Sequence, residues 1–197
     1  MIIYFDTETT GLKPGGIIQL SYIIETADGV VGKNFFCYNS FISPESTMVH
    51  GITVEKLQTL SKGKTFYDYA DEIERDFESA DLLIAHNFPF DFNFMCAEFA
   101  NCYKTFTFKE KFDTMRYFTP VVKIPKANGK GYKYPKLCEL AEFFDIFPYD
   151  ATRFAVKLFS DSGASHDARF DIAETYLCVK EARARYETFD EEIKKYL

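Results

Sequence analysis

Short apolar runs separated by turn residues make up the first part of the chain. One run predicts a buried strand over residues 1–6, followed by a glycine- and proline-rich turn that contains Pro14. A second apolar run predicts a strand at residues 17–25, and the turn at residues 27–29 leads into a third strand near residues 30–42. Three strands joined by such short turns form an antiparallel meander.

Beyond the meander, helical and extended patterns alternate. Helices are predicted in short pieces within residues 44–60 (broken at Gly51, with Thr53 as N-cap), and over residues 65–79, 89–101, 115–118, 135–144 and 166–187. Strands are predicted at residues 81–85 and 104–112, and residues 120–134 have the composition of a loop within the domain. This order predicts an α/β fold, a mixed central sheet with helices on both faces.

The composition is that of one globular domain. With 197 residues, of which 47% are hydrophobic and 27% charged, the chain is expected to form a single domain over residues 1–197. It contains 22 Phe and 13 Tyr but no Trp. We expect most of these rings in the core, although exposed ones would offer stacking surfaces for bases.

Cysteine usage and hydropathy bear on the compartment. The five cysteines are odd in number and form no C-x-x-C pair, which favours reduced thiols and a cytoplasmic protein over a disulfide framework or a zinc site. No apolar run reaches the roughly 18 residues that a membrane helix needs. The chain starts with a predicted strand and lacks a basic leader, so neither a membrane segment nor a signal peptide is expected.

The charge distribution limits the partners. A net charge of −7 argues against a protein that wraps tightly around duplex nucleic acid. Residues 123–136, however, contain five lysines and no acidic residue, together with Tyr132 and Tyr134. This stretch is interpreted either as a solvated loop or as a groove that contacts a few phosphates.

Acidic residues stand out in three short motifs. Asp6 and Glu8 follow the first apolar run, two residues apart and therefore on one face of a strand. Asp91 follows the predicted strand at residues 81–85, and Asp171 lies about one turn into the predicted helix at residues 166–187. Carboxylates about 5 Å apart repel each other by roughly 3 kcal/mol at an effective dielectric constant near 20, so such a cluster needs cations. Oxygen ligands alone favour Mg²⁺ or Mn²⁺ over zinc.

The third motif also contains His166, five residues before Asp171. A histidine titrates near neutral pH and can accept a proton from water without being a metal ligand. All three histidines of the chain, His50, His86 and His166, fall within or beside such motifs.

Each acid alone has other interpretations. Asp6 can cap the end of a strand, or be the nucleophile of a phosphatase of the haloacid dehalogenase type, although that family has a second Asp where Glu8 stands. Asp91 can cap the start of a helix, and Asp171 can be a solvated helix residue. Only the combination of motifs in this order therefore indicates a shared site.

Together, Asp6-x-Glu8, Asp91 and His166-x₄-Asp171 resemble the DEDDh family of 3′→5′ exonucleases, and within it the proofreading ε subunits of bacterial DNA polymerase III. The sister branch has Tyr four residues before the last Asp, where this chain has Asp167. The resemblance implies a ribonuclease H-like (exonuclease) fold. It implies that Asp6, Glu8, Asp91 and Asp171 bind two divalent cations and that His166 is the general base. It also implies substrate contacts by Thr7, Thr9, Gly11, Leu12, Val49, His50, Asn87 and Phe90.

The predicted function is therefore hydrolysis of nucleic acid from a free 3′ end. The resemblance implies release of nucleoside 5′-monophosphates, Mg²⁺ as cofactor with Mn²⁺ as a substitute, and a DNA polymerase or another replication or repair protein as a possible partner. Single-stranded DNA is the favoured substrate. Two alternatives stay open, an RNA-trimming exoribonuclease of the same family and a nuclease-fold module that binds nucleic acid without cleaving it.

Overall fold

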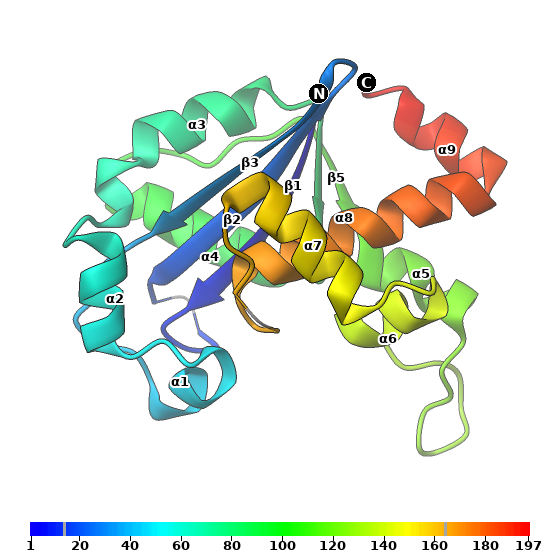
Figure 1. The fold of residues 1–197 in the computed structure, drawn as a ribbon, viewed down its shortest axis with the longest axis horizontal. Coiled ribbons are helices and arrows are strands. Elements are labelled where there is room, and N and C mark those ends of the chain that lie inside the picture. Colours follow the sequence, from blue (N-terminus) through cyan, green and yellow to red (C-terminus); the bar gives the residue numbers. More distant parts are fainter. Residues whose placement is uncertain (14, 164) are drawn as a thin grey trace.

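The computed structural model describes residues 1–13, 15–163 and 165–197, so Pro14 of the first predicted turn lies outside the described residues. Five strands form one sheet of order β3-β2-β1-β4-β5 (Figure 1). Their bounds are β1 Ile2–Thr9, β2 Ile17–Thr26, β3 Gly29–Phe36, β4 Leu82–Ala85 and β5 Glu110–Asp113. The helices are α1 Pro44–His50, α2 Val54–Ser61, the 3₁₀ turn η1 Phe66–Asp68, α3 Ala70–Ser79, α4 Phe88–Asn101, α5 Thr114–Val122, α6 Leu137–Phe143, α7 Pro148–Phe159, α8 Ala168–Arg185 and α9 Glu187–Lys194.

The predicted meander and mixed sheet are confirmed. β1 pairs antiparallel with β2, and β2 with β3, whereas β1–β4 and β4–β5 are parallel pairs. The carboxyl ends of β1, β4 and β5 therefore meet at one edge of the sheet, where ligands of open α/β sheets bind. The first strand is longer than predicted and continues through the first motif to Thr9, because β2 provides partners as far as Glu8↔Gln19 and Thr9↔Ile17.

Two strand predictions were too long. The third strand ends at Phe36 rather than near residue 42, because Phe36 pairs with Gln19 close to the start of β2. The predicted strand over residues 104–112 is reduced to β5, because its neighbour β4 provides only Leu82–Ala85 as partners.

The helix predictions were incomplete. α7 and α9 were missed, and α8 begins at Ala168 rather than at residue 166. α6 begins two residues after Pro135 and not at it. The break at Gly51, which has a φ of 67°, and the N-cap at Thr53, whose side chain accepts from the Lys56 N–H, are as predicted.

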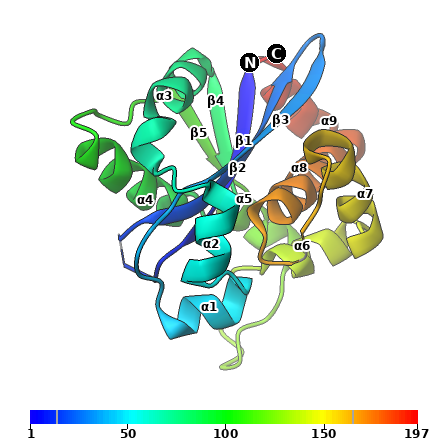
Figure 2. The same ribbon diagram turned by 60° about the vertical axis from the view of Figure 1, so that its left-hand side comes forward.

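Apolar side chains pack on both faces of the sheet, and these two layers hold the molecule together. On one face, Ile3 and Phe5 pack with residues of α3 and α4; on the other, Ile2 and Tyr4 pack with α8 and α9. Figure 2 shows the sheet between α3 and α4 on one side and α7 and α8 on the other. The aromatic residues concentrate there as expected, with Phe5, Phe77 and Phe88 in edge-to-face contact.

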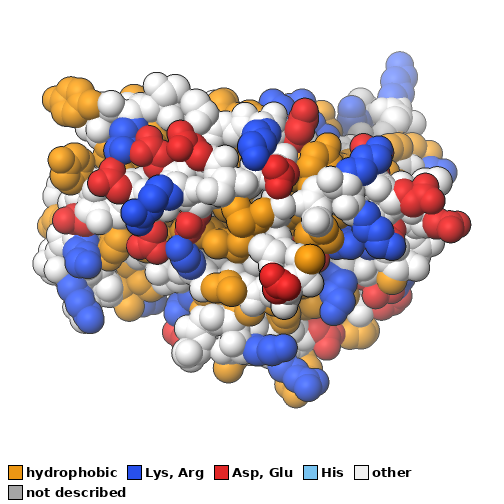
Figure 3. Space-filling view, turned by 90° about the horizontal axis from the view of Figure 1, so that it is seen from above, with side chains coloured by type: hydrophobic (Ala, Val, Ile, Leu, Met, Phe, Trp, Pro, Cys, Tyr) orange, Lys and Arg blue, Asp and Glu red, His pale blue; other side chains and the backbone are white. Residues whose placement is uncertain are grey.

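The five cysteines all lie within the described ranges and are free thiols. On the face that carries both chain termini, acidic and basic side chains are interspersed (Figures 1 and 3). None of the helices within the described ranges combines the length and apolar character that a membrane span requires.

α7 packs closely on β3 at Gly32. A Cβ atom at this glycine would lie 2.9 Å from the Cβ of Leu158 and 2.6 Å from the ring of Phe159. We therefore expect Gly32→Ala to lower the free energy of unfolding by about 1–3 kcal/mol through overpacking. Urea denaturation measures this loss. Val31→Ala, at the exposed neighbouring position, is the control and should change stability by less than about 0.5 kcal/mol. Equal stabilities of Gly32→Ala and the wild type would contradict this packing.

Candidate active site

Side chains alternate along β1, so its polar residues face two different helices on opposite sides of the sheet. Asp6 and Glu8 share the face of Ile2 and Tyr4, which is the face covered by α8. Asp171, in the first turn of α8, meets them there. One carboxylate oxygen from each of Asp6, Glu8 and Asp171 lies within 4.8 Å of the others. These three predicted residues are therefore brought together.

Asp91 reaches the same edge of the sheet from the opposite face. It lies in the first turn of α4 and is only 2% exposed. Its Oδ1 accepts a hydrogen bond from the Thr7 hydroxyl (2.7 Å) and one from the Thr7 N–H (3.1 Å). Thr7 thus fixes the orientation of Asp91, a contact that the sequence analysis did not anticipate. Asp91 is not part of the group within 4.8 Å, although it lines the same cavity.

Burial and mutual repulsion disfavour the charged forms of these acids. Burial, followed by the charges of Asp91 and Asp171, raises the pKa of Asp6 well above its usual value. Burial, followed by the charge of Asp171, does the same for the pKa of Glu8. Burial raises the pKa of Asp91 to about 7 and that of Asp171 to about 7. A divalent cation would offset the repulsion, so the site fits Mg²⁺ or Mn²⁺ by charge and by its oxygen-only donors.

His166 lies on the loop before α8 in a left-handed backbone conformation, with a φ of 63°. The backbone N–H of His166 donates to Asp171 Oδ1 (3.3 Å), and the ring Nδ1 lies 3.9 Å from Asp171 Oδ2. The side chain is 58% exposed. The imidazole is therefore beside the carboxylates and open to solvent.

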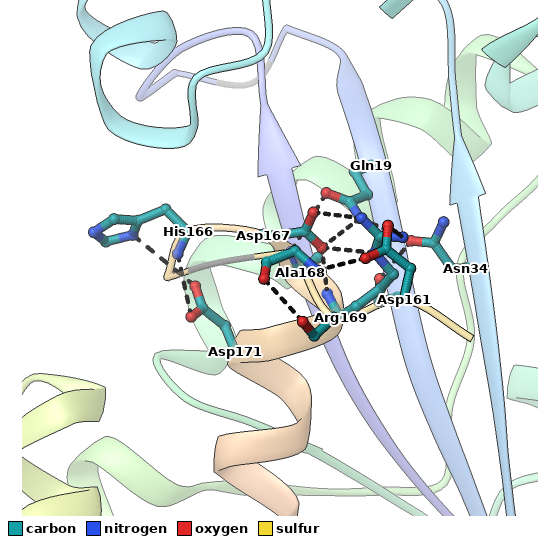
Figure 4. A network of polar contacts seen from close by, with 11 residues as sticks. Gln19, Asn34, Asp161, His166, Asp167, Ala168, Arg169 and Asp171 are labelled. Carbon is teal, nitrogen blue, oxygen red and sulfur yellow. Dashed lines mark hydrogen bonds and ion pairs between the residues drawn. The ribbon is translucent and has the colours of Figure 1, made fainter. Parts of the chain in front are cut away.

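The next residue, Asp167, anchors this loop to the sheet (Figure 4). Its Oδ1 accepts from Gln19 Nε2 of β2 (2.9 Å), and Gln19 also donates to Asn34 of β3. Arg169 binds both carboxylate oxygens of Asp167 and, through its remaining nitrogen, Asp161 (2.8 Å). We define Asn34, Gln19, Asp167, Arg169 and Asp161 as the anchor network. It places the start of α8, and so His166, relative to β2.

The carboxylates open into a cavity of about 320 Å³. All but one of the residues that the resemblance implied as substrate contacts line it: Thr7, Thr9, Gly11, Leu12, Val49, His50 and Phe90. Asn87 is the exception; it precedes α4 with a φ of 72°, and its N–H donates to Asp113. Glu45 and Ser46 of α1 line the cavity but were missed. Helical spacing could have identified them, because Glu45 lies four residues before Val49 and Ser46 four residues before His50, on the same side of a helix.

His50 and His86 make different contacts. His50 Nδ1 accepts from the Ile52 N–H (3.0 Å), which leaves the ring proton on Nε2. That buried Nε2 meets no hydrogen-bond partner among the described residues, and burial lowers the pKa of His50. His86 contacts Thr114 Oγ1 through Nδ1 (2.9 Å) and the Pro135 carbonyl through Nε2 (3.1 Å). A contact with the Thr9 backbone partly offsets this lowering, so the rings of His50 and His86 are both held by contacts within the protein.

A family model described as exonuclease, RNase_T, matches residues 3–145. DNA polymerase III subunit epsilon of Escherichia coli is 37% identical over 108 residues, which cover 50% of this chain and 43% of that protein. The same subunit of Rickettsia typhi is 33% identical over 147 residues, covering 70% and 60%. A 3′-5′ exonuclease, DinG of Staphylococcus saprophyticus, is 28% identical over 153 residues, covering 75% and 16%. The chain thus spans less than two thirds of each relative.

The fold also matches a solved structure, the metal-free form of a complex of Escherichia coli ExoI with single-stranded DNA. The TM-score is 0.69 over 98% of this chain and 42% of that chain, at 15% identity. At this identity the match shows a common fold, and it confirms the predicted exonuclease fold.

The raised pKa values predict how pH affects the metal-free protein. Carboxyl groups of the unfolded chain titrate near about 3.9, whereas Asp91 and Asp171 in the folded protein titrate near about 7. Between these values the folded state binds protons that the unfolded state has released. Stability is therefore expected to fall as pH rises from about 4 to about 7 and to level off above this range.

Thermal melts in EDTA across this pH range test the expectation. Asp91→Asn should make the fall smaller, because an amide does not titrate yet still accepts hydrogen bonds from Thr7, while the other acids with raised pKa values remain. A wild-type melting temperature that rises over this range would contradict the raised pKa values.

Proposed function

Because the chain belongs to the exonuclease family, we propose that it removes nucleotides one at a time from the 3′ end of a nucleic acid strand. The observation that carries the proposal is the approach of Asp6, Glu8 and Asp171 within 4.8 Å, in a cavity that also contains His166. The products would be nucleoside 5′-monophosphates. Single-stranded DNA is the proposed substrate, in keeping with the DNA polymerase III subunits among the relatives.

The carboxylates of Asp6, Glu8, Asp91 and Asp171 would hold two divalent cations, Mg²⁺ or Mn²⁺. Such cations, when bound, supply charge stabilisation to the attacking and leaving oxygens of a phosphodiester displacement. Two hydrogen bonds from Thr7 fix the position of Asp91 Oδ1. Because burial gives these acids a high proton affinity, cation binding and deprotonation of the acids would occur together.

His166 is the proposed general base. Its ring lies beside Asp171 and is exposed to the cavity, so it can take the proton of an attacking water. The left-handed backbone at His166 and the neighbouring anchor network fix the position from which the side chain extends. Asp167 and Gln19 are thus proposed positioning residues that act through His166.

The remaining lining residues would hold the terminal nucleotide. Leu12, 88% exposed, and Val49, 55% exposed, present apolar surface that would be covered by bases. His50, which also lines the cavity, would contact the terminal nucleotide through its ring. Thr9, Gly11 and Phe90 complete the proposed contacts, whereas for Asn87 only a role in shaping the start of α4 is proposed.

We further propose that residues 1–197 act as one exonuclease domain in the cytoplasm, where the free thiols would stay reduced. A DNA polymerase or another replication or repair protein is the proposed partner, by analogy with the epsilon subunits among the relatives. RNA trimming by the same site is the alternative substrate class.

Degradation of labelled oligonucleotides tests the function directly. With a 5′ label and Mg²⁺, the wild type should produce a ladder that shortens from the 3′ end, and EDTA should stop it. Asp6→Asn should abolish cleavage while binding of the strand in Ca²⁺ persists. Competition between DNA and RNA of one sequence identifies the preferred substrate. Strand binding by a wild type that does not cleave would favour the binding module instead.

Metal binding and proton transfer can be separated by two variants. We expect His166→Ala to lower the rate by roughly 10²-fold or more, while Mn²⁺ still raises its melting temperature. Asp171→Ala should lose both the activity and most of the Mn²⁺-dependent rise. Equal rates of His166→Ala and the wild type would remove the imidazole from the mechanism.

A further inference from the structure

Residues 123–136, which we call the basic hairpin, form an ordered projection rather than an irregular loop. Pro125 and Tyr132 are joined by an antiparallel bridge, and the Lys126 N–H donates to the Gly131 carbonyl (3.0 Å). The Lys133 N–H donates to the Ile124 carbonyl (2.9 Å). Figures 1 and 2 both show the hairpin projecting at the same end of the molecule as α1, away from the chain termini.

The hairpin concentrates positive charge in a chain that is acidic overall. It contains five lysines and no acid, against a net charge of −7 for the whole protein. Lys133 is paired with Glu139 (2.7 Å). Among the described residues, no carboxylate lies within salt-bridge distance of the others, Lys123, Lys126, Lys130 and Lys136. These four exposed lysines therefore keep their charge available to a ligand.

The hairpin is also connected to the candidate active site. His86 lines the cavity, and its Nε2 contacts the carbonyl of Pro135, where the hairpin returns to the body of the protein. Tyr134, the residue before Pro135, is 58% exposed, and Tyr132 is 44% exposed. A solvated loop would account for the lysines, and exposed tyrosines also occur elsewhere on the surface. The combination of exposed rings, lysines without a salt bridge and attachment to the cavity wall favours a binding role.

We infer that the basic hairpin binds the substrate strand upstream of its 3′ end, with lysines on the phosphates and a tyrosine stacked on a base. Aromatic rings beside a positively charged track are the usual features of single-strand binding without sequence preference. The inference rests on the proposed function, because it assigns the hairpin to the strand that leads into that site. It explains how an acidic protein holds a polyanion.

Two kinds of substrate test the inference. The p-nitrophenyl ester of thymidine 5′-monophosphate offers one nucleotide to the cavity, and oligothymidylates of increasing length also offer upstream phosphates. The double variant Lys126→Ala/Lys130→Ala should cleave the ester with wild-type kcat and KM. For long strands its KM should rise roughly tenfold, and each lost contact should lower the salt-dependence slope of log kcat/KM by about 0.7. For the shortest strands, the KM of the double variant should equal that of the wild type.

The control Lys157→Ala/Lys180→Ala removes the same charge from exposed positions on α7 and α8, and should not change KM for long strands. Tyr134→Ala should raise that KM roughly tenfold, and Tyr134→Phe should not, because a ring remains to stack. An equal KM for both lysine double variants overturns the inference, whatever other macromolecule the hairpin then binds.

The failure of the proposed function would look different. A wild type that cleaves neither substrate refutes the nuclease, and fluorescence anisotropy with a labelled oligothymidylate in Ca²⁺ then tests the hairpin by itself. Weaker binding by Lys126→Ala/Lys130→Ala than by the control supports the inference in that case, and equal binding overturns it.

Discussion

The candidate active site depends on holding several mutually repelling carboxylates close together. Carboxylate oxygens of Asp6, Glu8 and Asp171 are held within 4.8 Å of one another, and Asp91 lines the same cavity. Unit charges about 5 Å apart cost roughly 3 kcal/mol per pair at an effective dielectric constant near 20. Together with burial, this repulsion raises the pKa values of the acids, so the metal-free cluster holds protons instead of four full charges. The two apolar layers on the sheet keep the acids together, because they fix β1 between α4 and α8.

The alternation of side chains along β1 explains how two helices on opposite faces of the sheet contribute to one site. Even-numbered Asp6 and Glu8 face α8, and odd-numbered Thr7 faces α4, where it holds Asp91. A shift of one residue in the pairing of β1 would exchange these faces and separate Glu8 from Asp171. The same pairing that buries Ile2 and Tyr4 therefore also assembles the charges.

The sequence was most informative where local pattern and chemistry coincide. The spacing of Asp6 and Glu8 on one strand face, and the meander that follows, could be read without tertiary knowledge. Strand lengths could not, because β5 is limited by β4 and the third strand by β2.

The missed parts depend on tertiary contacts. α7 buries mainly the small residues Ala151 and Ala155, whose apolar signal is weak, and its close approach to β3 depends on the glycine at residue 32. The bond from Thr7 to Asp91 joins residues 84 positions apart, so no local pattern indicates it. The placement of Asn87 outside the cavity follows from the left-handed turn at the start of α4.

The anchor network has a consequence for how the site works over repeated turnovers. Asp167 is tied to β2 by Gln19 and clamped by Arg169, whose guanidinium also lies 5.5 Å from the ring centre of Phe36. His166, one residue earlier, is more than half exposed. A rigid pivot therefore adjoins a side chain with room to turn. If His166 is the general base that we propose, this exposure would let it pass its proton directly to bulk water while Asp167 stays tied to β2.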